Sequence, residues 1–404
     1  MKRYVFFTNS IRNMGGAQMY LRNKMLFLQK HGWEVAVFYF NDGEILIPEL
    51  KQFKRNRIPE LAYPISAISS TNRNRILEEI TEGLKGIEHL VFETHVYHMS
   101  LWAEKIAELV DARSILYILH ESLPSFSSKE LNFLRFKIER NEIMNALRFY
   151  PILNMYKEDN RDWIMPSYSN VTADIPFVLK YDKSRKTILS LGRLDKPYIT
   201  PMLHEIVKFA EETNSLVNLF LVGGAADDSY ITTIKEYLKG EDKVIPYFFG
   251  YMYPVPEIII KAADVAIASS GSVLVPTEHG IPTIAIDTQD YMAMGIYGIT
   301  TMNTFVRTTE PQIKTSDLLY NVLIENKFGK IDPRSIAVTL ESEKILQKHL
   351  ESLDTLDAPK EYFDVLSVYS GKDVFKQKAI MMSYKILGEN GVAALSKIIH
   401  RVIG

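Results

Sequence analysis

The first half of the chain alternates short apolar runs with segments of helical periodicity. The apolar runs are nearly continuous, which is typical of strands that are buried on both faces of a parallel sheet. Strands are therefore predicted at residues 4–7, 34–40, 61–64, 89–93, 114–119, 150–153 and 163–165. Helices are predicted at residues 17–31, 73–84, 100–110 and 129–148. This alternation predicts a first Rossmann-like domain with right-handed crossovers.

A second series with the same pattern follows a polar, turn-rich segment at residues 167–186, which we interpret as a linker. Its strands are predicted at residues 187–191, 217–222, 244–249, 265–268 and 283–286, and its helices at 201–213, 230–238, 257–263 and 273–279. Beyond residue 333 only helices are predicted, at 334–353, 374–387 and 391–403. The fold class is α/β, with two Rossmann-like doubly wound domains and a helical C-terminal extension. The predicted domains are residues 1–175 and 186–332, and the tail at 333–404 is expected to pack partly on the first domain.

The stretch at residues 262–287 is the most informative part of the second series. A short apolar strand runs into the polar turn Ser269-Ser270-Gly271-Ser272, in which Ser272 is a candidate helix N-cap. Gly280 fits the position that follows the end of the helix. A helix N-terminus at the carboxyl end of a parallel strand favours a phosphate group. A βαβ unit without any ligand has the same pattern, so both interpretations stay open.

Composition and charge exclude several classes of protein. The net charge is −2 over 404 residues, and the Arg-rich stretches at 51–57 and 72–75 lack interleaved aromatic residues, so we interpret them as surface loops and expect no nucleic-acid partner. The absence of cysteine excludes disulfides, thiolate catalysis and cysteine-ligated zinc. The N-terminal sequence resembles neither a signal peptide nor an anchor, and no apolar window reaches the length of a membrane span, so a cytoplasmic location is expected.

Six short motifs follow one another in an order that resembles the GT-B glycosyltransferases, most closely the family-four group. They are NMGGAQ at 13–18, SLGRLDK at 190–196, LVGG at 221–224, FGY at 249–251, AADV at 262–265 and GIP at 280–282. The resemblance implies two Rossmann-like domains that face each other across a cleft. A nucleotide-diphosphate sugar, linked to UDP or GDP, would be the donor substrate and would be held mainly by the second domain. No cofactor and no metal are implied.

The resemblance also implies roles for individual residues. His120, which follows a predicted strand, would face the transferred sugar as the catalytic candidate, with His95 and His98 as competing candidates. The donor would contact Gly15, Gly16, Arg193, Lys196, Gly250, Tyr251, Ser270, Ser272, Val273 and Glu278. A fixed guanidinium is suited to stabilising the charge of a departing nucleoside diphosphate. The two glycines would let the backbone approach the donor, although they also fit a plain strand-to-helix turn.

The chain departs from the family where two glutamates with the spacing E-x7-E are usual. Val275 stands where the second glutamate belongs, and Glu278 lies one helical turn later. The serine turn at 269–272 replaces the first glutamate. Glu278 would take over a contact to the ribose, or it is a plain helix residue. Two alternatives to a glycosyltransferase remain: a non-catalytic partner that binds an acceptor or stabilises an active glycosyltransferase, and a nucleotide-sugar epimerase.

The leading prediction is a metal-independent hexosyltransferase, retaining as in the family, although the glutamate departure leaves the stereochemical outcome open. It would transfer sugar to a glycan, lipid-linked or protein acceptor, in the assembly of surface polysaccharide or another glycoconjugate. The predicted helices at 129–148 and 391–403 carry basic residues beside apolar stripes. Such stripes favour either peripheral contact with the inner face of a membrane or burial against a sheet. The oligomeric state is not indicated by the sequence.

Overall fold

The computed structural model of the chain describes residues 2–12, 14–41, 43–119, 123, 125–155, 171–225, 227–329, 332, 342–354, 359, 361–369, 378–379 and 382. The chain forms two compact units. The first unit contains residues 1–13, 24–164 and 345–404, and the second contains residues 14–23 and 165–344. Each unit has its own sheet and its own hydrophobic core, so the two are treated separately.

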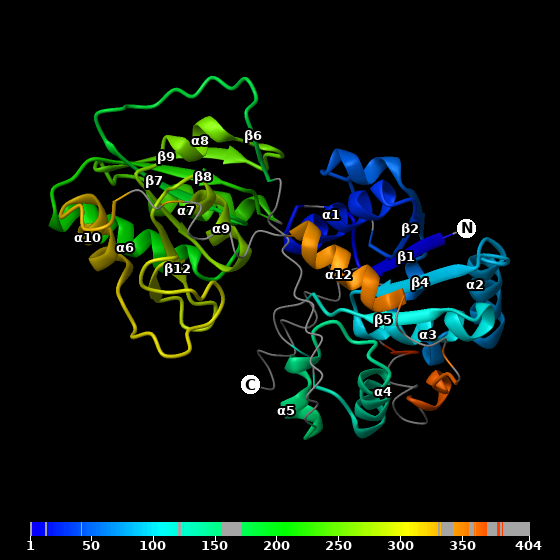
Figure 1. Ribbon diagram of the computed structural model, residues 1–404. Helices are drawn as coiled ribbons and strands as arrows, with labels where there is room; N and C mark the ends of the chain where they lie inside the picture. The colour runs from blue at the N-terminus through cyan, green and yellow to red at the C-terminus, as the bar shows by residue number, and fades with distance from the viewer. Residues whose placement is uncertain are drawn as a thin grey trace. The chain divides into compact units, whose positions relative to one another are not determined.

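The sheet of the first unit consists of five parallel strands in the order β3-β2-β1-β4-β5. The strands are β1 (Lys2–Thr8), β2 (Glu34–Tyr39), β3 (Lys54–Arg57), β4 (His89–Thr94) and β5 (Arg113–Leu116). The helices are α2 (Ser70–Glu82), α3 (Tyr97–Val110), α4 (Ser128–Glu139) and α5 (Tyr150–Leu153). Helix α1 (Gly16–Lys30) is divided, because its residues up to 23 belong to the second unit and the rest to the first. The chain adds β2 and β3 on one side of β1 and β4 and β5 on the other (Figure 1), so its topological switch point lies between β1 and β4.

Successive side chains of β1 face opposite sides of this sheet. Val5 and Phe7 belong to the core that includes residues of α2 and α3. Tyr4 faces the other side, where its hydroxyl contacts Glu93 and lies 3.3 Å from the Nε2 atom of His349 on α12 (Ser342–Asp354). Figure 1 shows α12 lying along the sheet beside β1 and β4. The tail therefore contributes a helix to the first unit.

Three predictions for the first unit are wrong. Residues 61–64 do not form a strand, because Pro59–Ala62 is a turn of 3-10 helix, and the strand comes earlier, at Lys54–Arg57. The predicted helix at 129–148 ends at Glu139, because Asn141 has a left-handed φ of 57°. Residues 150–153 form the short helix α5 instead of a strand.

Both Arg-rich stretches also differ from the predicted loops. Residues 54–57 form the fully exposed edge strand β3, and residues 72–75 lie in α2. An edge strand that carries charges has no continuous apolar run, so the hydrophobic pattern cannot reveal it. The predicted strand at 163–165, the helix at 391–403 and most of the helix at 374–387 lie outside the described residues.

The second unit has a six-stranded sheet in the order β13-β12-β11-β7-β8-β9, in which only β13 is antiparallel. Its strands are β7 (Lys186–Leu191), β8 (Val217–Val222), β9 (Val244–Gly250), β11 (Val265–Ala268), β12 (Thr283–Ile286) and β13 (Ala293–Ile296). A separate pair joins β6 (Thr172–Ala173) to β10 (Val255–Pro256). The helices are α6 (Ile199–Glu212), α7 (Asp228–Tyr237), α8 (Glu257–Lys261), α9 (Leu274–Glu278) and α10 (Thr315–Leu323). The fold class is therefore the predicted one.

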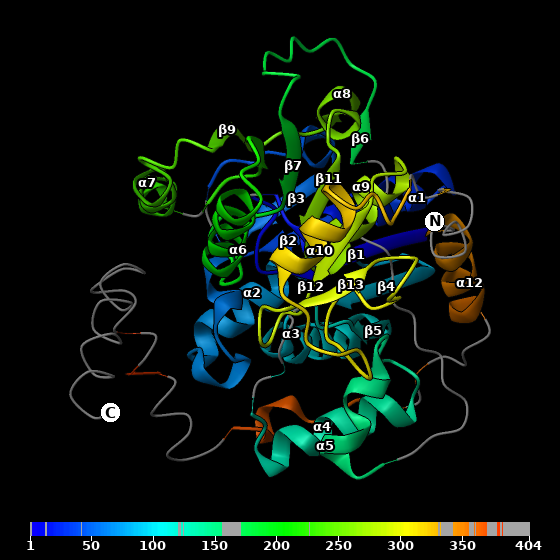
Figure 2. The ribbon, with the colours of Figure 1, turned by 90° about the vertical axis from the view of Figure 1, so that its left-hand side faces the viewer.

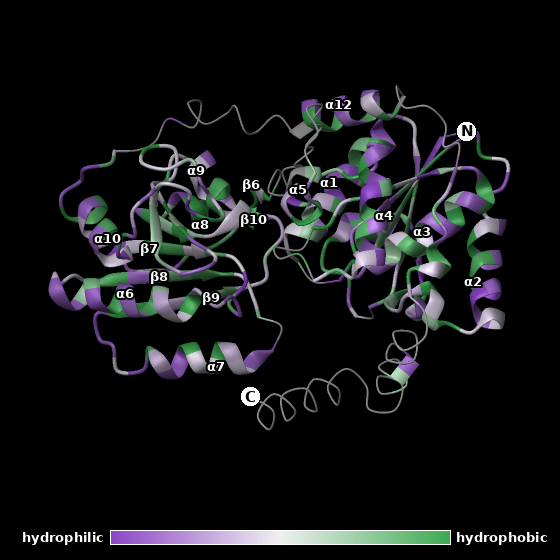
Figure 3. Cartoon of the chain, turned by 90° about the horizontal axis from the view of Figure 1, so that it is seen from below, coloured by the Kyte–Doolittle hydropathy of each residue, from purple (hydrophilic) through white to green (hydrophobic). Residues whose placement is uncertain are grey.

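Helices α6 and α10 contact each other and cover one face of this sheet (Figure 2). Apolar and polar residues alternate along α6 (Figure 3), and its apolar residues, such as Met202, Ile206 and Phe209, are buried. A second cover comes from residues 174–182, within the predicted linker. Phe177 and Tyr181 of this segment pack on the core of the unit. Among the described residues, no helix is long and apolar enough to cross a membrane.

Candidate functional site

The topology of the second unit determines where a ligand site is expected. From β7 the chain moves through β8 to β9 on one side, and it then returns to add β11 and β12 on the other side. The switch point therefore lies between β7 and β11. In open α/β sheets, ligands bind outside the carboxyl ends of the strands at such a point. There β7 leads into Gly192 and Arg193, and β11 leads into the serine turn at 269–272.

Three strand ends are joined to one another at this edge through glycines. A glycine stands at the end of each strand: Gly192 directly follows β7, Gly223 directly follows β8, and Gly250 is the last residue of β9. Their φ values of 145°, 139° and 69° favour glycine. The Gly192 N–H donates to the carbonyl of Val222 at 2.9 Å, and the Gly223 N–H donates to the carbonyl of Gly250 at 2.9 Å. These bonds place the residues that follow each strand next to one another.

The glycines also allow close packing that a larger residue would prevent. A Cβ atom on Gly223 would lie 1.9 Å from the carbonyl oxygen of Gly192. A Cβ atom on Gly224 would lie 2.3 Å from the ring of Tyr251. The backbone of the β8 turn therefore packs directly against the turn that carries Arg193, and the ring of Tyr251 lies over Gly224. Arg193 was predicted from the motif at 190–196, and Gly250 and Tyr251 from the motif at 249–251; the three residues come together here.

Arg193 brings an exposed cation to this edge. Its side chain is 44% exposed, and its Nε atom lies 3.2 Å from the Oδ1 atom of Asp195, whose side chain is 10% exposed. The pKa of the Tyr251 phenol is raised by burial and then by Asp195, while Arg193 acts in the opposite direction. The three groups therefore form one electrostatic cluster. Lys196 follows directly and is half-buried.

The serine turn at 269–272 lies on the β11 side of the switch point. A Cβ atom on Gly192 would lie 3.7 Å from the Oγ atom of Ser272, so the two turns are adjacent. Ser270 has a left-handed φ of 57°, and its N–H donates to the carbonyl of Thr304 at 2.6 Å. The hydroxyl of Ser269 is buried without a hydrogen-bond partner among the described residues. The serines thus bring small polar groups to the edge, some of which are already bonded to the protein.

The helix after this turn differs in detail from the prediction. Residues Ser270–Val273 form a 3-10 turn and α9 begins only at Leu274, so Ser272 is not an N-cap. The side chain of Val273 is fully buried in the core, which leaves only its backbone for a ligand. Gly280, with a φ of 74°, does follow the end of the helix, as predicted. The α-helix does not begin at the serine turn, because Ser270 adopts a left-handed conformation that an α-helix cannot contain.

Glu278 is the last residue of α9 and is partly buried. Burial raises the pKa of its carboxyl group to about 7. No partner that would hold its charge was found among the described residues. The neighbouring His279 accepts or donates a hydrogen bond at 3.0 Å to the hydroxyl of Thr172, so it belongs to the local structure. Glu278 is therefore a carboxyl group that gains from any ligand that donates hydrogen bonds to it.

The structure describes two of the three histidine candidates, which all belong to the first unit. His120 lies outside the described residues. His95 is buried, and its Nε2 atom lies 3.0 Å from a carboxylate oxygen of Glu93. Burial lowers the pKa of His98 to about 4. His95 is thus an enclosed side chain, and His98 is partly buried.

Gly15 precedes α1 and Gly16 is its first residue, and neither has a positive φ. A glycine is therefore not required there by backbone conformation. A Cβ atom on Gly15 would lie 3.3 Å from the amide oxygen of Gln18, which is the end of a flexible side chain. That these glycines let a ligand approach the backbone closely stays a prediction.

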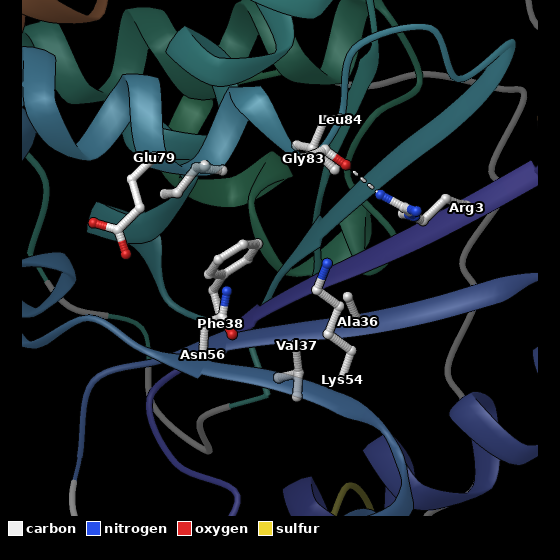
Figure 4. A pocket seen from close by; sticks show the side chains of 10 residues that line it. Arg3, Ala36, Val37, Phe38, Lys54, Asn56, Glu79, Gly83 and Leu84 are labelled. Atoms are coloured by element: carbon white, nitrogen blue, oxygen red, sulfur yellow. Dashed lines mark hydrogen bonds between the residues drawn. The ribbon is translucent and has the colours of Figure 1, made fainter.

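A surface hollow in the first unit lies apart from these residues. It is bounded by β2, the edge strand β3 and α2 (Figure 4), and Arg3, Lys54, Asn56 and Glu79 are among its lining residues. The Arg3 guanidinium already donates to Glu34 and to the carbonyl of Gly83. None of the predicted site residues lines this hollow. Within the described part of the chain, no group of histidine and carboxylate side chains is arranged to hold a metal ion.

Sequence reasoning missed two features of the second unit. One is Asp195, although it lies inside the motif at 190–196. The other is a contact directly after β12, in which Asp287 accepts hydrogen bonds from the backbone N–H and the Nε atom of Arg307 at 2.9 and 3.1 Å. Arg307 stands 20 residues after Asp287, in a region without periodic pattern. Only the tertiary structure brings them together.

No protein-family profile matches the chain, and no curated protein matches it. Solved structures do resemble it. HepE from Anabaena in complex with UDP aligns with a TM-score of 0.59 and 13% identity, covering 88% of this chain and 100% of that one. TarM from S. aureus in a complex that includes UDP gives 0.55 and 11%, covering 88% and 100%. The lipopolysaccharide outer core galactosyltransferase WaaB gives 0.54 and 15%, covering 87% and 99%. At these identities the likeness shows the fold, which is the GT-B fold.

Proposed function

We propose that the protein is a glycosyltransferase that uses a nucleotide-diphosphate sugar as its donor. The observation that carries the proposal is the edge of the second unit at the β7–β11 switch point. There the glycine contacts between the ends of β7, β8 and β9 bring the exposed guanidinium of Arg193 beside Tyr251, and the serine turn lies next to Gly192. An arginine at such an edge fits a diphosphate. The UDP complexes of HepE and TarM, which share the fold, support the same ligand class.

Each residue has a role in this proposal. Arg193 binds the diphosphate, with Lys196 adding positive charge nearby. Tyr251 and Gly250 form the wall beside the nucleotide, and the backbone of Ser272 and Val273 faces the phosphates. Ser270, whose N–H is bonded to Thr304, contributes its hydroxyl. Glu278 accepts hydrogen bonds from donor hydroxyls. For Gly15, Gly16 and His120 the roles come from the family resemblance: the two glycines would let the backbone approach the donor, and His120 would act on the transferred sugar.

The proposed chemistry depends on the negative charge that develops on the leaving nucleoside diphosphate. When the sugar leaves, the nucleoside diphosphate gains negative charge, and a fixed guanidinium stabilises that charge without a metal ion. Metal-independent transfer is therefore part of the proposal. Retention of configuration is added to it on the family resemblance alone. The acceptor would be a glycan, lipid-linked or protein group in surface glycan assembly. The likeness to WaaB, a lipopolysaccharide outer core galactosyltransferase, supports this class of acceptor. A cytoplasmic location, at or near the inner face of a membrane, would suit such an acceptor.

Calorimetric titration with UDP and GDP tests the ligand class. The wild-type chain should bind at least one of them, and Arg193→Ala should weaken that binding by about 1.5–3 kcal/mol, as expected for a hydrogen bond to a charged group. Glu236→Ala is a suitable control, because Glu236 is exposed on α7 and pairs only loosely with Lys239 at 3.5 Å. Unchanged affinity in Arg193→Ala would reject the assignment.

A donor screen tests the activity. Hydrolysis or transfer should be detected with at least one UDP- or GDP-linked sugar, and Arg193→Ala should reduce it. Nucleotide binding together with no turnover of any donor would instead favour the non-catalytic alternative.

A further inference from the structure

The turn between β7 and α6 holds a second charged residue whose position is tied to Arg193. Asp195 lies two residues after Arg193, and its Oδ1 atom is 3.2 Å from the Nε atom of the arginine. The two ends of the pair differ in exposure. The Asp195 side chain is 10% exposed and the Arg193 side chain is 44% exposed. One partner is therefore fixed in the protein, while the other reaches into solvent.

The geometry of the guanidinium decides which of its N–H donors the ion pair uses. An arginine has five N–H donors in a rigid plane, and only one of them is on Nε. The ion pair with Asp195 is made through Nε, so it does not use the two terminal nitrogen atoms with their four donors. Those are the atoms that bind phosphate oxygens in pairs.

The carboxylate itself stands on a rigid support. The intervening residue Leu194 is buried, and its N–H donates to the carbonyl of Gly224 at 2.8 Å. The ring of Tyr251 packs against Gly224, and Asp195 lies close enough to raise the pKa of the Tyr251 phenol. The turn therefore cannot shift without disturbing the joined ends of β8 and β9.

We propose that Asp195 is a positioning residue, which holds the guanidinium of Arg193 in the orientation that receives the diphosphate of the donor. This inference rests on the proposed function. Its physical basis is that a flexible arginine loses rotamer freedom when it binds a ligand, whereas an arginine that is already held loses less.

Asp195 also has an opposing effect, because its negative charge repels a diphosphate. The two effects can be separated by their dependence on Arg193. Repulsion acts whether or not the arginine is present, so its removal would strengthen binding in both backgrounds. Positioning acts only through Arg193, so its removal would weaken binding only when Arg193 is intact.

The test is a double-mutant cycle on the full chain, with UDP or GDP as the probe, whichever the wild type binds. We expect Asp195→Ala to weaken binding by about three- to tenfold, in line with the ordering of one long side chain. In the Arg193→Ala background the same substitution should cause no weakening. Asp195→Glu should recover part of the affinity, because it restores the charge.

The result that overturns the inference is an affinity that stays the same or rises in Asp195→Ala, or one that falls equally in both backgrounds. Asp195→Asn replaces the alanine variant if thermal unfolding shows that the latter is not folded, with the same expectation. Glu236→Ala serves as the matched loss of an exposed, paired carboxylate. If Arg193→Ala weakens binding and Asp195→Ala does not, only the positioning role fails. If the wild type binds neither nucleotide, the proposed function and the positioning role fail together.

Discussion

Each unit of the protein contains an ion-pair system, and the two systems differ in how far the positive charge is buried. In the first unit, the ammonium of Lys137 is fully buried, 2.5 Å from Glu104, 2.7 Å from Glu142 and 2.5 Å from the carbonyl of Ser114. In the second unit, Arg193 has one carboxylate neighbour and is 44% exposed. An ammonium has three donors, and all three of Lys137 are used inside the protein. The comparison teaches that a charge whose donors are all satisfied by the fold serves the fold, while a partly held charge at a switch point is available to a ligand.

Removal of Lys137 is expected to have the largest effect. Lys137→Met would leave the carboxylates of Glu104 and Glu142 buried with less compensation, which should lower the free energy of unfolding by about 3–5 kcal/mol. Urea unfolding followed by circular dichroism measures the loss. Lys239→Ala, which breaks an exposed pair, should change stability by less than about 1 kcal/mol. A loss of under 1 kcal/mol in Lys137→Met would contradict the structural role of the buried cluster.

Gly223→Ala affects both stability and the site. The new Cβ atom would lie 1.9 Å from the carbonyl oxygen of Gly192, on a residue whose φ is 139°. Strain of this kind should lower the free energy of unfolding by about 2–3 kcal/mol, and displacement of the Arg193 turn should weaken UDP binding. Gly240→Ala is the matched control, because Gly240 also has a positive φ, of 95°, but open space around it. Equal nucleotide affinities in the two variants would show that the contact between the glycine turns does not shape the site.

Glu278 should give the smallest effect and one that depends on pH. Its folded pKa of about 7 lies above the ordinary value of 4.5, so its contribution to stability is fully present below about pH 4.5 and is lost as the pH rises from there through 7. Glu278→Gln should therefore be more stable than the wild type at pH 8, by about 1–2 kcal/mol after allowance for partial exposure. The difference should shrink at pH 5. Thermal unfolding without ligand at the two pH values measures it, and a difference that does not depend on pH would show that Glu278 is a solvated helix residue.

Sequence reasoning located buried strands well. The predicted strands at 217–222, 265–268 and 283–286 coincide with β8, β11 and β12. These strands are covered on both faces, so each is a continuous apolar run that the sequence displays directly. The edge strand β3 has no such run, and α5 is a four-residue helix whose apolar sequence is equally typical of a strand. Short or edge elements depend on their neighbours, which the local sequence does not contain.

The candidate site was predicted in part. The motifs pointed to Arg193, Gly250 and Tyr251, because glycine turns at strand ends are visible in sequence. They did not indicate that Asp195 pairs with Arg193, or that the Gly223 turn packs on Gly192. Those relations depend on which strand ends are neighbours in the sheet, and the order β11-β7-β8-β9 is a property of the fold.

The sequence by itself determined the alternation of strands and helices, the division into two series and the positions of the glycine turns, because these follow from local hydrophobic periodicity and backbone freedom. Only the tertiary structure decided which charges meet. It enclosed Lys137 and Glu93 in the first unit and left Arg193 exposed at the switch point of the second. The reason is physical, since the burial of a charge and its distance to a partner are set by segments that lie far apart along the chain.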